Sequence, residues 1–580
     1  MTSPGRPLSS LTPRERCDQQ VKQMEAARQP MLQSWRDTEA YVAPFAANVD
    51  QIPYRFGDGF AVVHEAVYFC RATLAAFLSW GMTNQSRQWR QWAIKDPQLQ
   101  ESQAVKEFMH ELNARSMTML ARSNFYEVQS LVYGEWPAFG TSVVLIEEDE
   151  RDLVRYVLLG IGSYTLADDA RGETVAIARE VSMTVRQVVA RFATDASGDV
   201  NLSVLSKSTK DAVARGALED MITVCHLITP NDDYAPSKQT PEHFEWASLY
   251  WEKNSRATEG DGGFLAKEGY REWPAMVYRW RRRQGSPWGT DSPGILTAAA
   301  NKSLQQVESD LLMMVEKIAK PPLVVPAELT SASLLPGAQN SVTTRAGMLV
   351  QPLHEIHFNA VTVVREMVLS LVDRVERLWH TRLILALSGG YDVAGDKTAT
   401  EVEAIGQERY LVLGPLLDSS MPAFRAGSER EFAIMARAGV LPPIPPELEG
   451  VNLDIEYTSA LAVAQKSIGL SDLERFALFA AELAKATGDP SVLRKLDIEQ
   501  IMDEISIRAG VPPRVIRTDE QTKAIREAEA EAMAQQQAVE QGALEAKAAR
   551  DLSQAPTGGD TALSALMGAG QQGGGLGALR

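Results

Sequence analysis

Two helical segments, each bounded by proline, constrain the fold of this 580-residue chain more than any other feature. Apolar side chains recur in both segments at alternating steps of three and four residues, which puts them on one stripe of an α-helix. The first stripe consists of Leu304, Val307, Leu311, Met314 and Ile318, and the second of Val361, Val364, Val368, Leu371, Val375 and Leu378. Because each stripe needs a partner helix, the pattern predicts a helical hairpin.

The signals at the ends of these segments set the limits of the hairpin. Ser292 and Pro293 are a helix cap followed by a first-turn proline, and Pro321-Pro322 ends the first helix at residue 320. The second helix is predicted over 353–380, after Pro352. Residues 321–352 carry short apolar runs broken by proline and glycine, so we predict short strands and turns there. Taken alone, this unit is equally typical of an antiparallel coiled-coil arm in a globular protein.

The 292 residues before the hairpin predict helices followed by a sheet. Helical patterns cover 10–45, 61–81 and 102–122, and a short helix is predicted over 184–197. Runs rich in β-branched residues predict strands at 143–146, 154–158, 174–178, 221–229, 245–252 and 275–281. The predicted fold class is therefore α+β and predominantly helical, with several domains, because a chain of this length exceeds a single hydrophobic core.

Helical patterns dominate after the hairpin. Residues 398–446 hold a long helix that ends in a proline cluster, and 447–552 are helical, with few large apolar side chains after 519. Residues 553–580 are rich in glycine and predicted to be disordered. Between the hairpin and the long helix, 381–397 is predicted to be a flexible loop because it contains Ser388, Gly389, Gly390 and Gly395.

Charge and cysteine content exclude several classes of protein. The net charge of −17 argues against a free-standing surface for duplex DNA, since affinity for phosphates needs concentrated Lys and Arg. Cys17, Cys70 and Cys225 are widely spaced and match neither a disulfide framework nor a zinc motif. No apolar run reaches the length of a membrane span, so we expect a soluble chain that is not exported.

Catalytic and cofactor signatures have no positive support. The chain has no phosphate-binding GxxxxGK[ST] loop, and His354 and His357 lack a third metal ligand nearby, so we predict no enzyme activity, no cofactor and no metal. The most basic patch contains four arginines and two tryptophans: Arg279, Trp280, Arg281, Arg282, Arg283 and Trp288. Such a patch can meet phosphate with aromatic support, or it can be a solvated strand face or a salt-bridge surface between subunits.

Several short segments, in order along the chain, carry a resemblance to a known family. They are residues 78–89, 123–126, 139–141, 278–280, 289–293, 321–323, 398–402, 413–415, 438–442, 457–466 and 510–512. Together they resemble the head-to-tail connector, or portal, family of short-tailed double-stranded DNA bacteriophages. The chain departs from the family pattern at 288–289, where the family has Tyr-Gly, and at 87–89, where it has an Arg-Pro-Trp-like run.

The resemblance implies a ring of about twelve copies at one vertex of a phage capsid, through which DNA enters during packaging and leaves during infection. It assigns 1–292 to a wing, 293–320 and 353–380 to a stem and 321–352 to a clip that meets the packaging motor and the tail adaptor. It also makes 381–397 a channel-facing loop, 398–446 a wing helix and 447–552 a crown or barrel. Scaffold and capsid proteins are further implied partners, and no membrane is. The implied location is the virion, after assembly in the host cytoplasm.

A conduit through which DNA slides needs only sparse positive charge, because a strongly cationic lining would hold the duplex. Candidate contacts to phosphate are Lys302, Lys317, Lys320, Arg365, Arg374 and Arg377. Two other functions remain as alternatives. One is a coiled-coil scaffold or tail adaptor without a DNA lumen, and the other is a metal-dependent hydrolase using His354 and His357.

Overall fold

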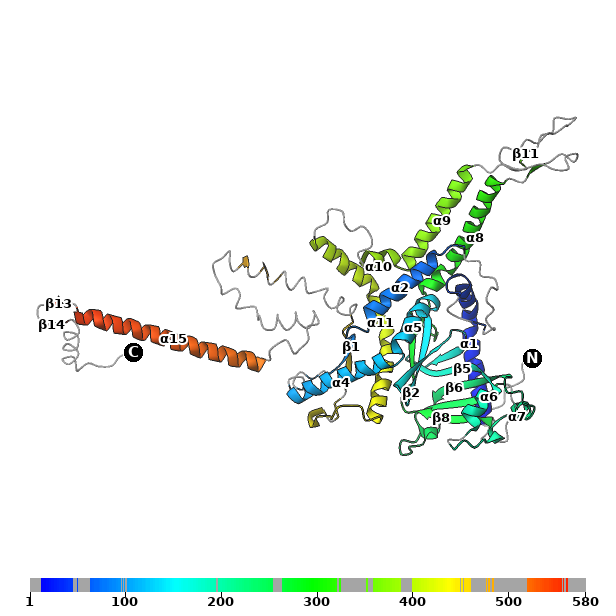
Figure 1. Ribbon diagram of the computed structural model, residues 1–580, viewed down its shortest axis with the longest axis horizontal. Coiled ribbons are helices and arrows are strands. Elements are labelled where there is room, and N and C mark those ends of the chain that lie inside the picture. The colour runs from blue at the N-terminus through cyan, green and yellow to red at the C-terminus, as the bar shows by residue number, and fades with distance from the viewer. Residues whose placement is uncertain are drawn as a thin grey trace. The chain divides into compact units, whose positions relative to one another are not determined.

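The computed structural model describes residues 12–44, 49–50, 63–94, 96, 99, 102–194, 197–253, 263–320, 323–324, 351–352, 358–387, 399–448, 450–451, 453–459, 476, 478–479, 482–483, 519–554, 556–557 and 560–561. The chain divides into two compact units, Met1–Lys495 and Leu496–Arg580, which are described separately (Figure 1). The first unit contains the sheets and the helical hairpin.

Helix α1 (Pro13–Tyr41) starts where the sequence predicts it. Thr12 and Glu15 form a capping box: the Thr12 hydroxyl accepts a hydrogen bond from Glu15 N (3.2 Å), and the Glu15 carboxylate accepts one from Thr12 N (2.9 Å). On the buried face of α1, the Trp35 indole N–H donates to the Phe139 carbonyl (3.2 Å), and its ring meets Trp288 edge-on at 4.8 Å. These contacts fix α1 to the central core.

Three more helices precede the first large sheet: α2 (Ala66–Met82), α4 (Gln103–Arg122) and α5 (Phe125–Phe139). The sequence predicted α2 and α4 but not α5, in which ten of the fifteen residues are buried, so that its apolar residues are not confined to one stripe. Helix α5 ends at Gly140, whose φ of +79° is left-handed. A Cβ at Gly140 would lie 2.6 Å from the Gly289 carbonyl oxygen, so only glycine fits this chain crossing.

Two antiparallel sheets follow. The first has the order β3-β2-β9, with β2 (Thr141–Asp149) at its centre between β3 (Leu153–Leu159) and β9 (Ala275–Arg279). In this sheet Val143 lies opposite Leu159 on one side and Val277 on the other. The second sheet has the order β4-β5-β6-β7-β8, formed by β4 (Tyr164–Asp168), β5 (Thr174–Thr184), β6 (Met221–Pro230), β7 (Trp246–Glu252) and β8 (Ala266–Tyr270).

All six predicted strand runs fall on observed strands, whereas β4 and β8 were missed. Between β5 and β6 the chain forms α6 (Val185–Val188), a π-helical turn over Val189–Ala193, a 3₁₀ turn over Leu202–Val204 and α7 (Lys207–Ala214). The predicted helix at 184–197 is therefore correct at its start and shorter than expected. A second 3₁₀ turn, Pro241–His243, precedes β7.

The predicted hairpin is present as α8 (Pro293–Ala319) and α9 (Phe358–Leu378), which lie side by side in Figure 1. Within 321–352 the structure describes only β10 (Leu323–Val324) and β11 (Gln351–Pro352), which pair antiparallel. After the hairpin come α10 (Thr381–Leu387) and the long helix α11 (Ala399–Arg437), which contains two prolines.

The chain beyond α11 corrects one predicted boundary. After a 3₁₀ turn at Pro446–Leu448, β12 (Asp454–Tyr457) pairs antiparallel with β1 (Arg90–Ala93), with Tyr457 opposite Arg90. The prediction that 447–552 is uniformly helical is therefore wrong at its start. The partner strand lies far away in the sequence, so no local pattern signals this pairing.

In the second unit, α15 (Asp519–Gln554) is a long helix whose described side chains are almost all exposed. It agrees with the predicted solvated helix, which was placed over 519–552. Beyond it β13 (Pro556–Thr557) and β14 (Asp560–Thr561) form a two-residue antiparallel pair, so the predicted disorder of 553–580 is wrong for these residues. The remainder of that tail lies outside the described residues.

Candidate functional site: the helical hairpin and the long helix

Helices α8 and α9 pack through the apolar stripes that the sequence identified. Leu304, Val368 and Leu371 form a buried cluster, with Leu304 fully buried and the other two 6% exposed. Val307 and Leu311 pack against this cluster from α8 and are partly buried. The structure therefore brings together the inner half of both stripes within one protomer.

The base of the hairpin is tied to the core by a polar link between its two helices. Thr297 and Trp379 are both fully buried, and the Trp379 indole N–H donates to the Thr297 hydroxyl (3.1 Å). That hydroxyl in turn donates to the Pro293 carbonyl one turn earlier (2.6 Å). The Ser292 side chain caps α8 and donates to the Ala138 carbonyl (3.2 Å), which fixes the start of α8 to the end of α5.

A second contact on α8 holds the chain segment that leads into α2. The Gln305 side-chain oxygen accepts hydrogen bonds from the backbone N–H of Val63 (2.8 Å) and of His64 (2.9 Å). Its amide N–H donates to the His64 carbonyl (2.8 Å). One side chain thus replaces the backbone partner that a neighbouring strand would supply, and it holds this segment against the hairpin.

The outer half of the hairpin leaves apolar side chains in solvent. Ile318, predicted for the first stripe, is 44% exposed there, whereas Leu378 of the second stripe is 41% exposed at the base of the hairpin, where α9 ends. Large apolar side chains outside the stripes are also exposed, namely Leu312, Met313, Val315, Val363, Met367 and Leu369. Val363 and Met367 lie one turn apart on α9 and form a second stripe, which a single hairpin does not cover.

The segment after α9 corrects the predicted channel loop. His380 adopts a left-handed conformation (φ +53°) that turns the chain sharply, and α10 begins at the next residue. Thr381 and Ile384 of α10 are buried, at 1% and 4% exposure, so the first seven residues of the predicted loop are a packed helix. The other predicted loop residues, Ser388, Gly389, Gly390 and Gly395, lie outside the described residues.

Ion pairs hold the corner between α9 and α10. The Arg382 guanidinium lies 2.8 Å from the Asp373 carboxylate and 2.7 Å from that of Glu376. Arg377 also pairs with Asp373 (2.6 Å), one turn away on α9. Arg377 was a candidate for contact with DNA phosphate. Because it is 74% exposed, this ion pair does not bury its charge.

The other five candidate basic residues lie at different heights on the two helices. All five are exposed: Lys302, Lys317, Lys320, Arg365 and Arg374. The Lys302 ammonium lies 5.5 Å from the centre of the Tyr41 ring, near the base of the hairpin. Lys317 and Lys320 are at the outer end of α8. The structure does not gather these six residues into one patch.

The structure turns part of the predicted arginine patch inward. The Arg279 side chain is 11% exposed and donates to the Asp168 carboxylate (2.5 Å) and to the Gly172 carbonyl (3.2 Å), and Arg282 lies 3.9 Å from the same carboxylate. Trp288 is 1% exposed and belongs to the central core, so it cannot support a phosphate. Phosphate binding by this group is therefore wrong for Arg279 and Trp288, and Arg279 instead joins the two sheets.

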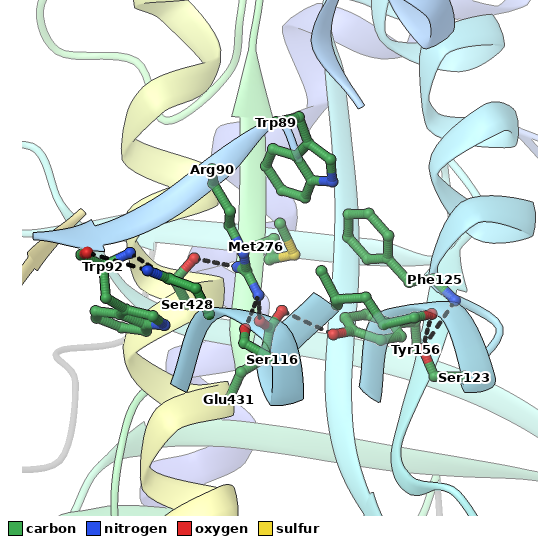
Figure 2. Close-up of polar contacts among 12 residues, drawn as sticks. Trp89, Arg90, Trp92, Ser116, Ser123, Phe125, Tyr156, Met276, Ser428 and Glu431 are labelled. Atoms are coloured by element: carbon green, nitrogen blue, oxygen red, sulfur yellow. Dashed lines mark hydrogen bonds and ion pairs between the residues drawn. The ribbon is translucent and has the colours of Figure 1, made fainter. Parts of the chain in front are cut away.

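The long helix α11 is fixed to the sheets by a buried ion pair (Figure 2). Arg90 of β1 is 4% exposed and Glu431 of α11 is 1% exposed, and their side chains are hydrogen-bonded to each other. Arg90 also donates to the hydroxyls of Ser428 on α11 and Ser116 on α4 (3.2 Å for Ser116). The Tyr156 hydroxyl of β3 donates to the other Glu431 oxygen (2.7 Å).

This network joins four elements in a dry environment. Burial lowers the pKa of Arg90, but the Glu431 carboxylate outweighs it, so the pKa is raised and Arg90 stays charged. Burial and the same carboxylate raise the pKa of the Tyr156 hydroxyl well above its usual value, so it stays protonated as a donor. The Arg90 guanidinium lies 5.1 Å from the centre of the Trp89 ring, which stacks on Phe125.

Two further arginines attach the last turns of α11. Arg430 lies 2.7 Å from the Glu272 carboxylate and 3.5 Å from that of Glu148 at the end of β2. Arg437 pairs with both of the same carboxylates. One turn before Glu431, Gly427 lets α11 approach β9, since a Cβ there would lie 2.8 Å from the Met276 sulfur.

One buried carboxyl stands apart from every ion pair in the core. Glu135 of α5 is 6% exposed, and burial raises the pKa of its carboxyl to about 8, while the Ser142 hydroxyl (3.5 Å) and Arg71 lower it less. Glu135 is therefore neutral at pH 7. Sequence reasoning missed Glu135 and Glu431 because an isolated Glu in a helix is usually solvated.

The described part of the chain offers no metal centre, since no three His, Cys, Asp or Glu side chains there are grouped to hold an ion. His354 and His357 lie outside it. None of the described helices is long and apolar enough to cross a membrane.

Comparison with known proteins gives a family match over most of the chain. The model of the family described as bacteriophage head to tail connecting protein matches residues 14–516. The portal protein of Salmonella phage epsilon15 is 29% identical over 568 residues, which cover 96% of this chain and 98% of that protein. A protein of Bordetella phage BPP-1, named as a probable portal protein, is 29% identical over 532 residues, covering 90% and 91% of the two chains.

Solved structures of gene transfer agent (GTA) particles also contain similar chains. A chain in the virion of a native particle aligns with a TM-score of 0.31 and 9% identity over 73% of this chain and 90% of its own length. A chain in the neck of an empty particle aligns with a TM-score of 0.34 and 10% identity over 78% and 94%. At these TM-scores the alignments do not support conclusions about individual elements.

Proposed function

The chain belongs to the family of bacteriophage head to tail connecting proteins, and from this premise we propose that it acts as a phage portal protein, the conduit for DNA at one vertex of the capsid. The observation that carries the proposal is the extent of the match: the family covers 14–516, and the portal protein of phage epsilon15 is similar along nearly its whole length. In this role the chain is a structural component of the virion and needs no catalytic site.

We further propose that the protomers close into a ring of about twelve copies, with the α8/α9 hairpins side by side around the axis. The exposed apolar residues on the outer half of the hairpin support this arrangement. Val363 and Met367 are 64% and 50% exposed in the protomer, and Leu312 is 56% exposed. Neighbouring hairpins in a ring would remove these side chains from water, at a gain of about 25 cal/mol for each Å² buried.

The charge of the chain fits transit of DNA better than tight binding. A ring of chains that each carry a net charge of −17 repels phosphate overall. The exposed side chains of Lys302, Lys317, Lys320, Arg365 and Arg374, together with Arg377, would then offer isolated contacts along the tube. We propose that such contacts guide the duplex without holding it, because fewer phosphate contacts give weaker binding and a shallower salt dependence.

The remaining proposals concern the partners of the ring. Residues between α8 and α9 form its clip, which would meet the packaging motor during genome entry and the tail adaptor afterwards. Residues 1–292 and α11 form the wing that faces scaffold and capsid proteins, and 460–552 form the crown. These assignments come from the family resemblance, and assembly would take place in the host cytoplasm.

Electron microscopy of the purified protein tests the proposal. We expect closed rings whose central hole admits duplex DNA. In Val363→Asp, a charge enters the proposed contact between hairpins, and we expect the ring fraction to fall at least tenfold, because an unpaired charge in an apolar interface costs about 2 kcal/mol or more per copy.

Gln306→Glu is the control, since it also adds one negative charge at an exposed position of the hairpin, on the polar side of α8. It replaces the hydrogen bond from Gln306 to Asp310 by a like-charge pair one turn apart, which costs only about 0.2–0.5 kcal/mol at an exposed site. It should assemble like the unchanged chain. Particles without a hole would favour the scaffold or tail adaptor, and equal assembly of Val363→Asp and Gln306→Glu would refute the role of the hairpin stripe.

A further inference from the structure

A cavity of about 220 Å³ lies between the two sheets and contains an excess of arginine. Arg155 of β3, Arg179 of β5 and Arg191 of the π-helical turn line it, and Glu147 of β2 is the one acidic residue among the lining side chains. These arginines come from three separate elements, so the cavity is a product of the tertiary fold and has no signature in the sequence.

The three guanidinium groups differ in how far they are already engaged. Arg179 donates from Nε to the His226 ring (2.9 Å) and reaches Glu147 only at 3.7 Å. Arg191 donates to the Tyr250 hydroxyl (3.2 Å). The Arg155 guanidinium has neither a hydrogen bond nor an ion pair within the described residues, although it lies on the strand directly opposite Glu147. Several N–H donors therefore remain available at the cavity.

The residues that line the cavity compensate the charge of the arginines only in part. His226 is fully buried, and burial together with Arg179 and Arg191 lowers its pKa well below the usual value, so it is neutral. Glu268 of β8 interacts with Arg191 and Glu147, and Asp149 at the end of β2 interacts with Arg155, but neither carboxylate lines the cavity. Among the lining side chains three arginines face the single carboxylate of Glu147, so an inserted carboxylate would meet positive charge.

The shape of the cavity indicates what kind of carboxylate fits. Half of the lining residues are apolar, among them Val157 next to Arg155 on the same face of β3, and Phe192 next to Arg191. Such walls suit the methylene groups of an Asp or Glu side chain, while the guanidinium forks suit its two oxygens. A free phosphate has no methylene groups and would leave the apolar wall uncovered.

We propose that this cavity is a docking site for an acidic side chain of a second copy of this chain. The proposal rests on the ring proposed above, which places copies side by side, and each copy supplies 75 Asp and Glu residues against 58 Lys and Arg residues. The inserted carboxylate pairs with Arg155 and Arg191 and links the sheets of one protomer to its neighbour. It thereby adds a charged contact to the apolar contact between hairpins.

Charge reversal at the cavity tests the proposal through ring assembly measured by mass photometry. In Arg155→Glu, two carboxylates would face each other, so we expect the protomer concentration at half-assembly to rise about tenfold or more, which corresponds to about 1.4 kcal/mol. Arg151→Glu is the matched control, because Arg151 is exposed in the turn between β2 and β3 and does not line the cavity. We expect it to shift half-assembly less than twofold.

A zero-length cross-link identifies the inserted residue. In Arg155→Lys, a carbodiimide joins the new amine to a carboxylate in contact with it, and rings assembled from equal amounts of ¹⁵N-labelled and unlabelled protomers distinguish neighbours from single chains. We expect cross-linked peptides of mixed isotope. Cross-links confined to peptides of one isotope would overturn the proposal, as would their absence from assembled rings.

The outcomes separate this proposal from the proposed function. If the unchanged chain forms no closed ring, the portal proposal fails first. If it forms rings and Arg155→Glu and Arg151→Glu assemble equally well, only the docking site is refuted. A third outcome would assign the cavity to a small oxyanion and overturn the proposal. In that case inorganic phosphate stabilises the unassembled protomer, Arg155→Glu abolishes this effect, and no cross-linked peptides of mixed isotope form.

Discussion

Neutralising Glu431 should destabilise the first unit more than any other single charge change on α11. Glu431→Gln keeps the shape of the side chain and an oxygen that accepts from Tyr156, but it leaves the Arg90 guanidinium charged at 4% exposure. Only the neutral hydroxyls of Ser428 and Ser116 then face that charge. Removal of one partner from a buried pair costs about 3–5 kcal/mol, a large share of the 5–15 kcal/mol that typically stabilises a domain.

Urea unfolding followed by tryptophan fluorescence measures this loss, because Trp89 is 1% exposed and lies over Arg90. Glu429→Gln serves as the control, since Glu429 is an exposed residue of the same helix and should change stability by less than about 0.5 kcal/mol. The double variant Arg90→Met with Glu431→Met should lose much less unfolding free energy than the sum of the losses in the single variants Arg90→Met and Glu431→Met. Replacing both partners by apolar side chains leaves no unpaired buried charge. Single variants that each cost under 1 kcal/mol, or additive effects, would refute the reasoning.

Two further predictions concern other buried polar groups. Glu135 has a pKa of about 8 in the folded chain against 4.5 unfolded, so its contribution to stability is complete below about pH 4.5 and is lost as pH rises through 8. Glu135→Gln should therefore reduce the fall in unfolding free energy between pH 5 and 9 by several kcal/mol, and an unchanged pH profile in urea titrations would contradict this. Thr297→Val removes the acceptor for the Trp379 indole and should cost about 1–3 kcal/mol, with faster hydrogen exchange at the base of α8 and α9. Thr118→Val, which loses only an exposed bond to its own helix, should leave that exchange unchanged, and equal exchange in both variants would refute the link.

The hairpin was predictable from the sequence because its signals are local. Ser292-Pro293 marks the start of α8, and the alternation of three and four residues identified the sides on which α8 and α9 face each other, including Leu304 of α8 and Leu371 of α9. Strands β2, β3, β5, β6, β7 and β9 were likewise predicted from local runs of β-branched residues. In each case the signal lies within one element.

The contacts that fix α11 were not predictable, since they join residues that lie far apart in the sequence. Arg90 and Glu431 are 341 positions apart, and each alone is typical of a solvated surface. The pairing of β1 with β12 likewise joins segments that lie far apart in the sequence, which explains the wrong boundary at 447. The prediction of a loop over 381–397 was wrong at its start for a different reason. It was based on glycines in the second half of the segment, whereas the first seven residues, Thr381–Leu387, are apolar enough to pack as α10.

The two halves of the hairpin differ in how they are held. Its base is held by Trp379, Thr297 and Gln305, all attached to the core or to each other by hydrogen bonds, so it moves with the first unit. Its outer half has no such bonds to the described core, and its apolar side chains are 44–64% exposed there. In a ring, neighbouring copies would supply the missing contacts of the outer half. Helices α2 and α10 pack against α9, and α10 also contacts α11, so a movement of one hairpin would be passed to α11 through elements already in contact. The outer half would then become rigid only on assembly, whereas the base would be rigid in the single protomer as well. Hydrogen exchange measured on the protomer and on the ring should therefore show that only the outer turns of α8 and α9 gain protection in the ring.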